Sequence, residues 1–229
     1  MSLAAITIVD WSGRAFQLEN KSAFRNWILS PRELEDDPGY KPECPDVPAR
    51  LRGKSSTLSR LVMAPFFEVT SLNRLHPSEV DLVFASRYGE IRTLETLLDA
   101  IYCFQPVSPL DFCNSVHHTA TGYISIAAQN RGISRTVSAG EQTFAAGLME
   151  CWQLLHTGRS ETVALLVGDE AVPSFFDTPS RFAYGLAILF QKSKAGDQFP
   201  ISLDRIQEVC NLSVSATEWL RQRLKMSEV

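Results

Sequence analysis

The adjacent histidines His117 and His118 are the most conspicuous polar pair in the sequence. A zinc site built on a helix uses histidines four residues apart on one face, whereas adjacent side chains diverge by about 100° around the helix axis. The pair therefore does not indicate a metal site, and we expect no bound metal. We expect one imidazole to be buried and hydrogen-bonded and the other to be partly exposed, and a pocket-lining role stays open.

A second candidate for chemistry is the segment from Ser138 to Thr143, which contains Gly140 and Glu141 and lies where a predicted strand turns into a predicted helix. Such a bend presents backbone N–H groups and the positive end of a helix dipole, so it suits a nucleophile. The segment is not the Gly-x-Ser-x-Gly elbow of hydrolases, and the chain has no Gly-rich phosphate loop with Lys-Ser/Thr. On these residues alone, Glu141 is equally well a first-turn acid that complements the dipole.

A third candidate is a local reversal of charge between residues 48 and 60, where the basic residues Arg50, Arg52, Lys54 and Arg60 occur without an acid. Such a patch can steer a phosphorylated or acidic partner even on an acidic protein. The alternative is an ordinary solvated loop.

The overall composition limits the classes of function. The chain has 229 residues, of which 45% are apolar, so it can fill a core. Its formal net charge of −4 argues against binding nucleic acid or anionic lipid. No apolar run approaches the roughly 20 residues that span a bilayer, and the first residues do not resemble a signal peptide. We therefore expect no membrane span and a cytoplasmic protein.

The five cysteines are scattered and form no C-x-x-C pair, which argues against a disulfide framework or a thiolate zinc site. We expect reduced thiols, with Cys103, Cys151 and Cys210 as small core residues.

Apolar runs typical of buried strands alternate with segments of helical periodicity, which predicts an α/β fold with its sheet between helical layers. The predicted strands are 4–9, 81–86, 134–138, 162–167 and 184–190. The predicted helices are 55–69, 91–101, 114–130, 144–155, 203–210 and 216–225. Pro65 predicts a kink or early break in the first helix, and the Pro-rich stretch 31–54 predicts a long surface loop.

The order of these elements resembles the N-terminal half of β-ketoacyl synthases. The segments that carry the resemblance are 82–86 with Gly89, 108–117 with Gly122, 136–140, Gly158 with 163–168, and 181–187. More narrowly, the chain resembles the short ketoacyl-synthase-like proteins of type II polyketide and aryl-polyene pathways. The resemblance implies a thiolase-like half-fold, with a mixed sheet of about five strands covered by helices on both faces. Residues 1–191 would form this domain, and residues 192–229 would be a C-terminal extension with an amphipathic helix.

The resemblance also implies a missing nucleophile. In a condensing enzyme, the strand before the long helix ends at a cysteine that takes an acyl chain from a carrier protein. Here that position is Gly140, or Glu141 if the alignment slips by one residue. Cys113 is the only cysteine close to a family motif, and it is a weak candidate for a replacement nucleophile. By the same resemblance, we expect the second half, which carries the family's catalytic histidines, to be absent from this protein.

We therefore predict a non-catalytic, chain-length-factor-like accessory subunit of type II fatty-acid or polyketide synthesis. The predicted pocket residues are Ser138, Glu141, Asn114, Ser115 and His117. The predicted docking residues for an acyl carrier protein are Arg50, Arg52 and Lys54. No resident cofactor is expected, only a phosphopantetheine-linked acyl group that the carrier protein presents.

The expected assembly is a homodimer or a heteromer with a full-length ketosynthase, because a half-fold would leave strand 134–138 and an apolar face without a partner. The helix 216–225 would cover part of that face. Two alternatives stay open. One is a condensing or acyl-transfer enzyme completed by a partner chain. The other is an unrelated α/β ligand-binding domain, although no G-x-G-x-x-G motif for a dinucleotide follows the first strand.

Overall fold

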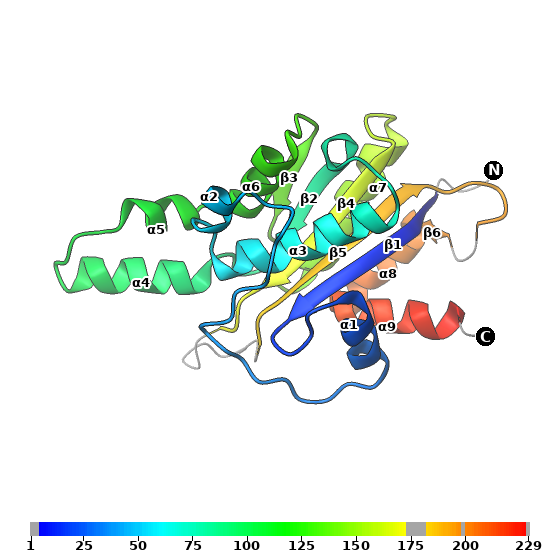
Figure 1. The fold of residues 1–229 in the computed structure, drawn as a ribbon. Coiled ribbons are helices and arrows are strands. Elements are labelled where there is room, and N and C mark those ends of the chain that lie inside the picture. The colour runs from blue at the N-terminus through cyan, green and yellow to red at the C-terminus, as the bar shows by residue number, and fades with distance from the viewer. Residues whose placement is uncertain (1–4, 173–181, 198–199, 228–229) are drawn as a thin grey trace.

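The computed structural model describes residues 5–172, 182–197 and 200–227, and in these ranges it contains one mixed sheet of six strands in the order β3-β2-β4-β5-β1-β6 (Figure 1). The neighbours β3 (Ser134–Val137), β2 (Asp81–Ala85) and β4 (Thr162–Asp169) run parallel. The neighbours β4, β5 (Tyr184–Lys192), β1 (Ala5–Ala15) and β6 (Ile201–Ser202) run antiparallel. Ala4 and Arg181, which belong to predicted segments, lie outside the described residues.

The predicted mixed α/β fold is confirmed, although the sheet has six described strands where we expected about five. The additional strand, β6, is only two residues long and pairs with the start of β1. A strand this short has no alternation of apolar and polar residues from which it could be recognised in the sequence.

Helices cover both faces of the sheet (Figure 1). One face packs against α1 (Lys21–Leu29), α7 (Thr143–His156), α8 (Leu203–Leu212) and α9 (Ala216–Ser227). The other face packs against α3 (Thr57–Leu72) and α6 (Thr119–Ala128). The remaining helices are α2 (Ala49–Arg52), α4 (Ile91–Tyr102) and α5 (Pro109–Asn114). Short 3₁₀ turns occupy Pro77–Glu79 and Gly140–Gln142.

The alternation of side chains along the central strands explains their uninterrupted apolar sequences. On β2, Val83 and Ala85 enter the core below α7, whereas Leu82 and Phe84 enter the core below α3. Successive side chains of a strand point to opposite faces, so a sheet that is covered on both sides needs apolar residues at every position.

The helix α3 runs through Pro65 to Leu72, so the early break predicted at this proline is wrong. Pro65 has no N–H to donate to the carbonyl of Leu61, one helical turn earlier. Gly185 on β5 lies against that same carbonyl, and a Cβ at Gly185 would overlap it. The missing donor and the missing side chain together let α3 lie close on the sheet.

The predicted helix 114–130 is wrong in its first part, because the chain forms two helices there. The helix α5 ends at Asn114, and α6 runs from Thr119 to Ala128 and is capped by Gln129, whose φ of 53° is left-handed. The signal for α5 was present in the sequence, since the Ser108 hydroxyl caps it and Pro109 takes its first position.

The long loop 31–54 is predicted correctly except for the single turn of α2. Buried Cys44 and Val47 fasten the loop against α3. The Arg52 guanidinium donates a 3.0 Å hydrogen bond to the carbonyl of Cys44, and Arg60 donates one of 2.6 Å to the carbonyl of Arg52.

All five cysteines lie in the described part of the chain, and none of them forms a disulfide there. Cys151 is buried in α7 and Cys210 is half-buried, but Cys103 is exposed, so its prediction as a core residue is wrong. Cys103 follows the last residue of α4, a helix that extends away from the sheet (Figure 1).

The C-terminal helices share the core of the sheet. Trp219 of α9 makes an edge-on contact with Phe144 of α7, with ring centroids 5.3 Å apart. Arg221 donates a 2.6 Å hydrogen bond to the carbonyl of Ile28 at the end of α1. In this way α9 covers α7 and α1. Within the described residues, no helix has the length and apolar character needed to cross a membrane.

Candidate functional site

The bend between β3 and α7 is built around Gly140. This residue has a φ of +58°, in the left-handed region that glycine adopts without strain. The neighbouring residues from Ser138 to Gln142 are exposed. No described atom would lie within 4 Å of a Cβ at Gly140, so the space above the bend is open.

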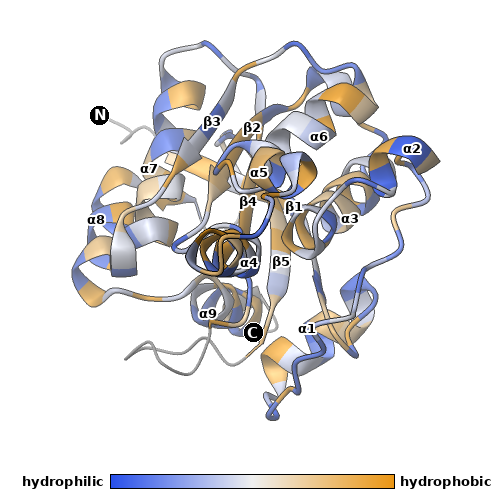
Figure 2. Cartoon of the chain, turned by 90° about the vertical axis from the view of Figure 1, so that its left-hand side faces the viewer, coloured by the Kyte–Doolittle hydropathy of each residue, from blue (hydrophilic) through white to orange (hydrophobic). Residues whose placement is uncertain are grey.

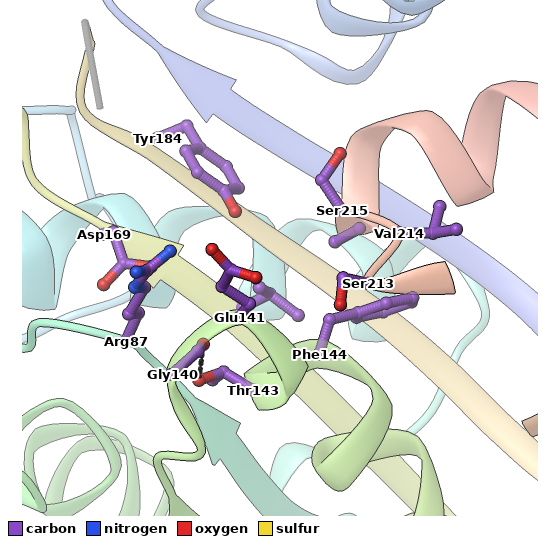
Figure 3. A pocket seen from close by; sticks show the side chains of 12 residues that line it. Arg87, Gly140, Glu141, Thr143, Phe144, Asp169, Tyr184, Ser213, Val214 and Ser215 are labelled. Carbon is purple, nitrogen blue, oxygen red and sulfur yellow. Dashed lines mark hydrogen bonds between the residues drawn. The ribbon is translucent and has the colours of Figure 1, made fainter. Parts of the chain in front are cut away.

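A cavity of about 370 Å³ lies over this bend (Figure 3). It is bordered by the ends of β2 and β4, the start of β5, the bend itself and the link between α8 and α9. Its lining residues are Arg87, Gly140, Glu141, Thr143, Phe144, Val167, Asp169, Tyr184, Ser213, Val214, Ser215 and Ala216. Among the described residues, therefore, the cavity lining offers neither a cysteine nor a histidine.

Figure 3 shows the Glu141 carboxylate and the Tyr184 hydroxyl reaching into the same space, with Arg87 and Asp169 on one side and Ser213 and Ser215 on the other. Burial raises the pKa of Tyr184, so its phenol stays protonated at neutral pH. The cavity thus offers hydroxyl groups, two carboxyl groups and one guanidinium for binding.

Asp169 is fixed at the end of β4. Its carboxylate accepts hydrogen bonds from the Ser86 hydroxyl (2.8 Å) and from the backbone N–H of Tyr88 (2.9 Å). Burial raises the pKa of Asp169, and these hydrogen bonds act in the opposite direction. The carboxylate therefore holds the end of β2, which carries Arg87, in place beside the cavity.

The predicted pocket residues fall into two groups. Gly140 and Glu141 line the cavity, and Ser138 lies beside it, where its hydroxyl donates a 3.2 Å hydrogen bond to the carbonyl of Arg87. Asn114 and Ser115 lie instead at the end of α5. There, Asn114 is buried and donates a 2.9 Å hydrogen bond to the carbonyl of Lys54.

The two histidines lie near the junction of α5 and α6. His117 is half-buried, makes a tilted ring contact with Phe84 and lies 3.2 Å from the carbonyl oxygen of Ser86. His118 is exposed and forms hydrogen bonds with the hydroxyls of Thr136 (2.7 Å) and Ser134 (3.2 Å) on β3. We expected one buried, hydrogen-bonded histidine and one partly exposed histidine; instead His117 is only half-buried and His118 is exposed, although both are hydrogen-bonded.

The basic residues of the loop differ in their contacts and in their exposure to solvent. Arg52 directs its guanidinium to the carbonyls of Cys44 and Val47. Arg50 and Lys54 are exposed on the surface. The loop thus presents two of the three predicted docking residues to solvent, while Arg52 also holds the loop together.

Glu90 is a feature that the sequence analysis missed. Its side chain is buried, and its Oε1 accepts hydrogen bonds from the hydroxyls of Ser56 (2.6 Å) and Ser59 (3.1 Å) at the start of α3. Burial, aided by the nearby Glu170, raises the pKa of Glu90 to about 8. A single acid before an amphipathic helix gives no sequence signal of such burial.

The mixed sheet between helical layers, with a strand-to-helix bend at the site, is the thiolase-like fold of ketosynthases. A family model described as "Beta-ketoacyl synthase, N-terminal domain" matches residues 24–227, and the chain belongs to this family. The resemblance predicted from the sequence is confirmed. None of the curated proteins matches the chain significantly.

Solved structures with the same fold include a chain from a ketosynthase (ApeO) in complex with its chain length factor (ApeC) from Xenorhabdus doucetiae. It has 24% identity and a TM-score of 0.70, and 91% of each chain is covered. A chain of the ishigamide ketosynthase/chain length factor has 16% identity and a TM-score of 0.67, over 86% of this chain and 64% of that chain. A chain from a type II polyketide acyl-carrier protein in complex with its ketosynthase has 10% identity and a TM-score of 0.64, over 83% of this chain and 63% of that chain. This chain thus spans less than two thirds of the length of the last two chains.

Proposed function

We propose that this chain is a non-catalytic subunit of ketosynthase fold that assists type II polyketide or fatty-acid synthesis, in the manner of a chain length factor. The observation that carries the proposal is the cavity over Gly140, whose described lining lacks both the thiol and the imidazole that condensation needs. The family membership and the ketosynthase and chain length factor complexes among its structural neighbours support the proposed pathway class.

The positions of the cysteines support the same conclusion. Cys151 is buried inside α7, and burial raises the pKa of its thiol well above the ordinary value. Cys44 belongs to the long loop and is buried against α3, and burial raises the pKa of its thiol to about 11. Cys103 and Cys113 are exposed but lie outside the cavity lining. Loss of a covalent nucleophile together with its base lowers kcat by a factor of about 10⁴ to 10⁶.

The proposed partners are a ketosynthase, which supplies the thiolate and the histidines, and an acyl carrier protein. Exposed Arg50 and Lys54 are the proposed contacts for the carrier protein, since their charges complement the phosphate of its phosphopantetheine arm. The cavity over the bend, with Glu141 in its lining, is the proposed contact for the acyl group.

The test is a condensation assay with purified ketosynthase, acyl-loaded carrier protein and malonyl-loaded carrier protein. We expect no product from this chain alone, and a change in the yield or length of the product when it is added to the ketosynthase. Glu141→Ala should alter product length while leaving the rate of condensation unchanged. Product formed by this chain alone would refute the proposal. A rate that collapses in Glu141→Ala would instead favour an enzyme that the two chains complete together.

A further inference from the structure

The helices α4 and α5 stand away from the sheet. We call residues 91–116, which comprise α4, α5 and their connection, the arm. Figure 1 shows α4 and α5 side by side beyond the sheet, and Figure 2 looks along α4. Among the described elements, α5 is the one against which α4 packs extensively. The position of the arm therefore depends on the few contacts at its base.

Glu90, the residue before the arm, joins it to α3. Glu90 is only 5% exposed, and its Oε1 accepts hydrogen bonds from the hydroxyls of Ser56 (2.6 Å) and Ser59 (3.1 Å). No side-chain hydrogen bond caps α4 itself. The carboxyl thus binds the first turn of α3 and not its own helix.

Both ends of the arm meet near this carboxyl. On the near side, Gly89 has a φ of +61°, and a Cβ there would lie 2.9 Å from the ring of His117, which follows the arm. On the far side, Asn114 accepts a 2.9 Å hydrogen bond from the hydroxyl of Tyr123. Burial, followed by the nearby Glu90, raises the pKa of this phenol. A change at Glu90 therefore acts on the whole base of the arm.

The charged groups around Glu90 are mostly acids. Glu170, which is 2% exposed, is the charged group that acts on Glu90, and Asp36 and Asp169 act on Glu170 in turn. In the described part of the chain, Arg92 is the one cation that acts on Glu170. It already forms an ion pair with Asp36, and its backbone N–H donates a 3.0 Å hydrogen bond to Glu170. A negative charge on Glu90 would have no cation of its own.

The second carboxyl oxygen of Glu90, Oε2, is buried and has no hydrogen-bond partner among the described residues. An ionised carboxylate carries charge on both oxygens, so it would leave a buried charged atom unpaired. Such an atom costs more than an unpaired neutral hydroxyl. The geometry therefore suits the protonated carboxyl, and burial raises the pKa of Glu90 to about 8.

We infer that the proton on Glu90 is a latch that holds the arm against α3. While the proton is present, the carboxyl joins the two helices without an unbalanced charge. Loss of the proton puts a second buried charge beside Glu170, and this favours an opened state in which Glu90 reaches water and the base of α4 separates from α3. The pH thus sets the balance between two positions of the arm.

The latch is connected to the wall of the cavity over Gly140. The backbone N–H of Gly89 donates a 2.9 Å hydrogen bond to the hydroxyl of Ser86, and this hydroxyl binds Asp169 in the cavity lining. Arg87, also in the lining, belongs to the same short segment. Opening of the latch therefore loosens the side of the cavity that carries Arg87.

The direction of the pH effect follows from the two states. Glu90 titrates near 4.5 when it is in water and near 8 when the latch is closed. The opened state loses the proton first, so the stabilisation is complete below about pH 4.5 and is lost progressively as the pH rises to about 8. Between these limits, each pH unit lowers the ratio of latched to opened molecules by up to about tenfold.

The test is hydrogen exchange of the full chain at pH 5.5 and pH 7.5, read by mass spectrometry and corrected for the pH dependence of intrinsic exchange. We expect the protection of α4 amides in wild type to fall by about tenfold to a hundredfold. This exchange should occur through a local opening that low concentrations of urea hardly affect, because little surface is exposed.

Three variants assign the effect. Glu90→Gln cannot ionise, so the protection of α4 should be equal at the two pH values. Glu170→Gln removes the neighbouring charge and should make the fall smaller than in wild type, because an ionised Glu90 is then less costly. The matched control Asp99→Asn changes an exposed acid of α4 and should show the same fall as wild type.

Unchanged protection of α4 in wild type would overturn the inference, and this comparison needs no variant to fold. An equal fall in Glu90→Gln would also overturn it, because the titrating group would then be another, such as Tyr123. If Glu90→Gln does not fold, an undiminished fall in Glu170→Gln has the same meaning. Exchange of α4 with the urea dependence of α7 would show that the arm opens only with global unfolding, which would refute the latch.

Discussion

The hydroxyl of Thr143 donates a 2.7 Å hydrogen bond to the carbonyl oxygen of Gly140, across the bend that precedes α7. The same hydroxyl accepts a 3.0 Å hydrogen bond from the backbone N–H of Ala139. Thr143 itself is buried, whereas Ala139 and Gly140 are exposed. One side chain thus holds the left-handed turn that leaves the space above Gly140 open.

This relationship predicts that Thr143→Val lowers the free energy of unfolding by about 1 kcal/mol, because it removes the two hydrogen bonds that the hydroxyl makes to the backbone of the bend. Urea denaturation measures the loss. The control Thr143→Ser keeps the hydroxyl and should retain most of the stability. Equal losses in the two variants would show that the methyl contact, and not the hydrogen bonds, stabilises the bend.

A cysteine at the bend should restore acylation without condensation. Gly140→Cys places a thiol in open space at the start of α7, where the helix N-terminus favours the thiolate. We expect the variant to take an acyl group from an acyl thioester and to form no condensation product, since the described cavity lining supplies no histidine. Peptide mass mapping locates the adduct, and buried Cys151 serves as the internal control. Condensation by this single variant would show that the chain retains a functional base.

The buried carboxyl of Glu90 predicts a pH dependence of stability. Its pKa is raised to about 8 in the folded chain by burial, whereas an unfolded glutamate titrates near 4.5. The unfolded state therefore loses this proton first, and the stability from the protonated carboxyl is present below about pH 4.5 and is lost as the pH rises to about 8.

Glu90→Gln removes this titration. Relative to wild type, we expect the variant to gain stability steadily between pH 5 and pH 8.5, even if its amide is less stable than the acid at pH 5. Urea denaturation across this pH range provides the measurement. Glu161→Gln changes an exposed carboxyl and serves as the control, and its free energy of unfolding should follow the same pH dependence as that of wild type. A wild-type profile parallel to that of Glu90→Gln would contradict the assigned protonation of Glu90.

The close approach of β5 to α3 predicts different outcomes for two glycine substitutions. Gly185→Ala would place a methyl group on the Leu61 carbonyl and should cost about 1–3 kcal/mol of stability. Gly122→Ala adds the same atom to α6, where no described atom lies within 4 Å, and should stabilise the chain by about 0.5–1 kcal/mol. Thermal unfolding of both variants tests the pair. A neutral Gly185→Ala would mean that α3 shifts easily on the sheet.

Strong periodic signals made most of the fold predictable from sequence. Strands β2 and β4 are buried on both faces, so their apolar runs are uninterrupted, and the predicted helix 144–155 matches α7, whose Phe144 and Leu148 face the core. The early break predicted at Pro65 is wrong because the cost of the missing hydrogen bond depends on Gly185, which is far away in the sequence. Local patterns carry no information about such pairings.

The site was only partly predictable for a related reason. The bend at Gly140 could be predicted because a strand ends there and a helix begins. Tyr184 and Ser215 reach the cavity only because the order of the strands and the packing of α9 bring them there, and neither can be read from local sequence. The apolar stripe of α4 was recognised as helical, but periodicity alone cannot distinguish a face that packs on its own core from one left exposed.

The most direct test of the central claim is the intact mass of the wild-type chain after incubation with acyl-loaded carrier protein, with Gly140→Cys as the positive control. We predict no acyl adduct on the wild type and one on the variant. A stable acyl adduct on the wild-type chain that alkylation of its cysteines prevents would contradict the claim, because it would reveal a nucleophilic thiol serving the cavity.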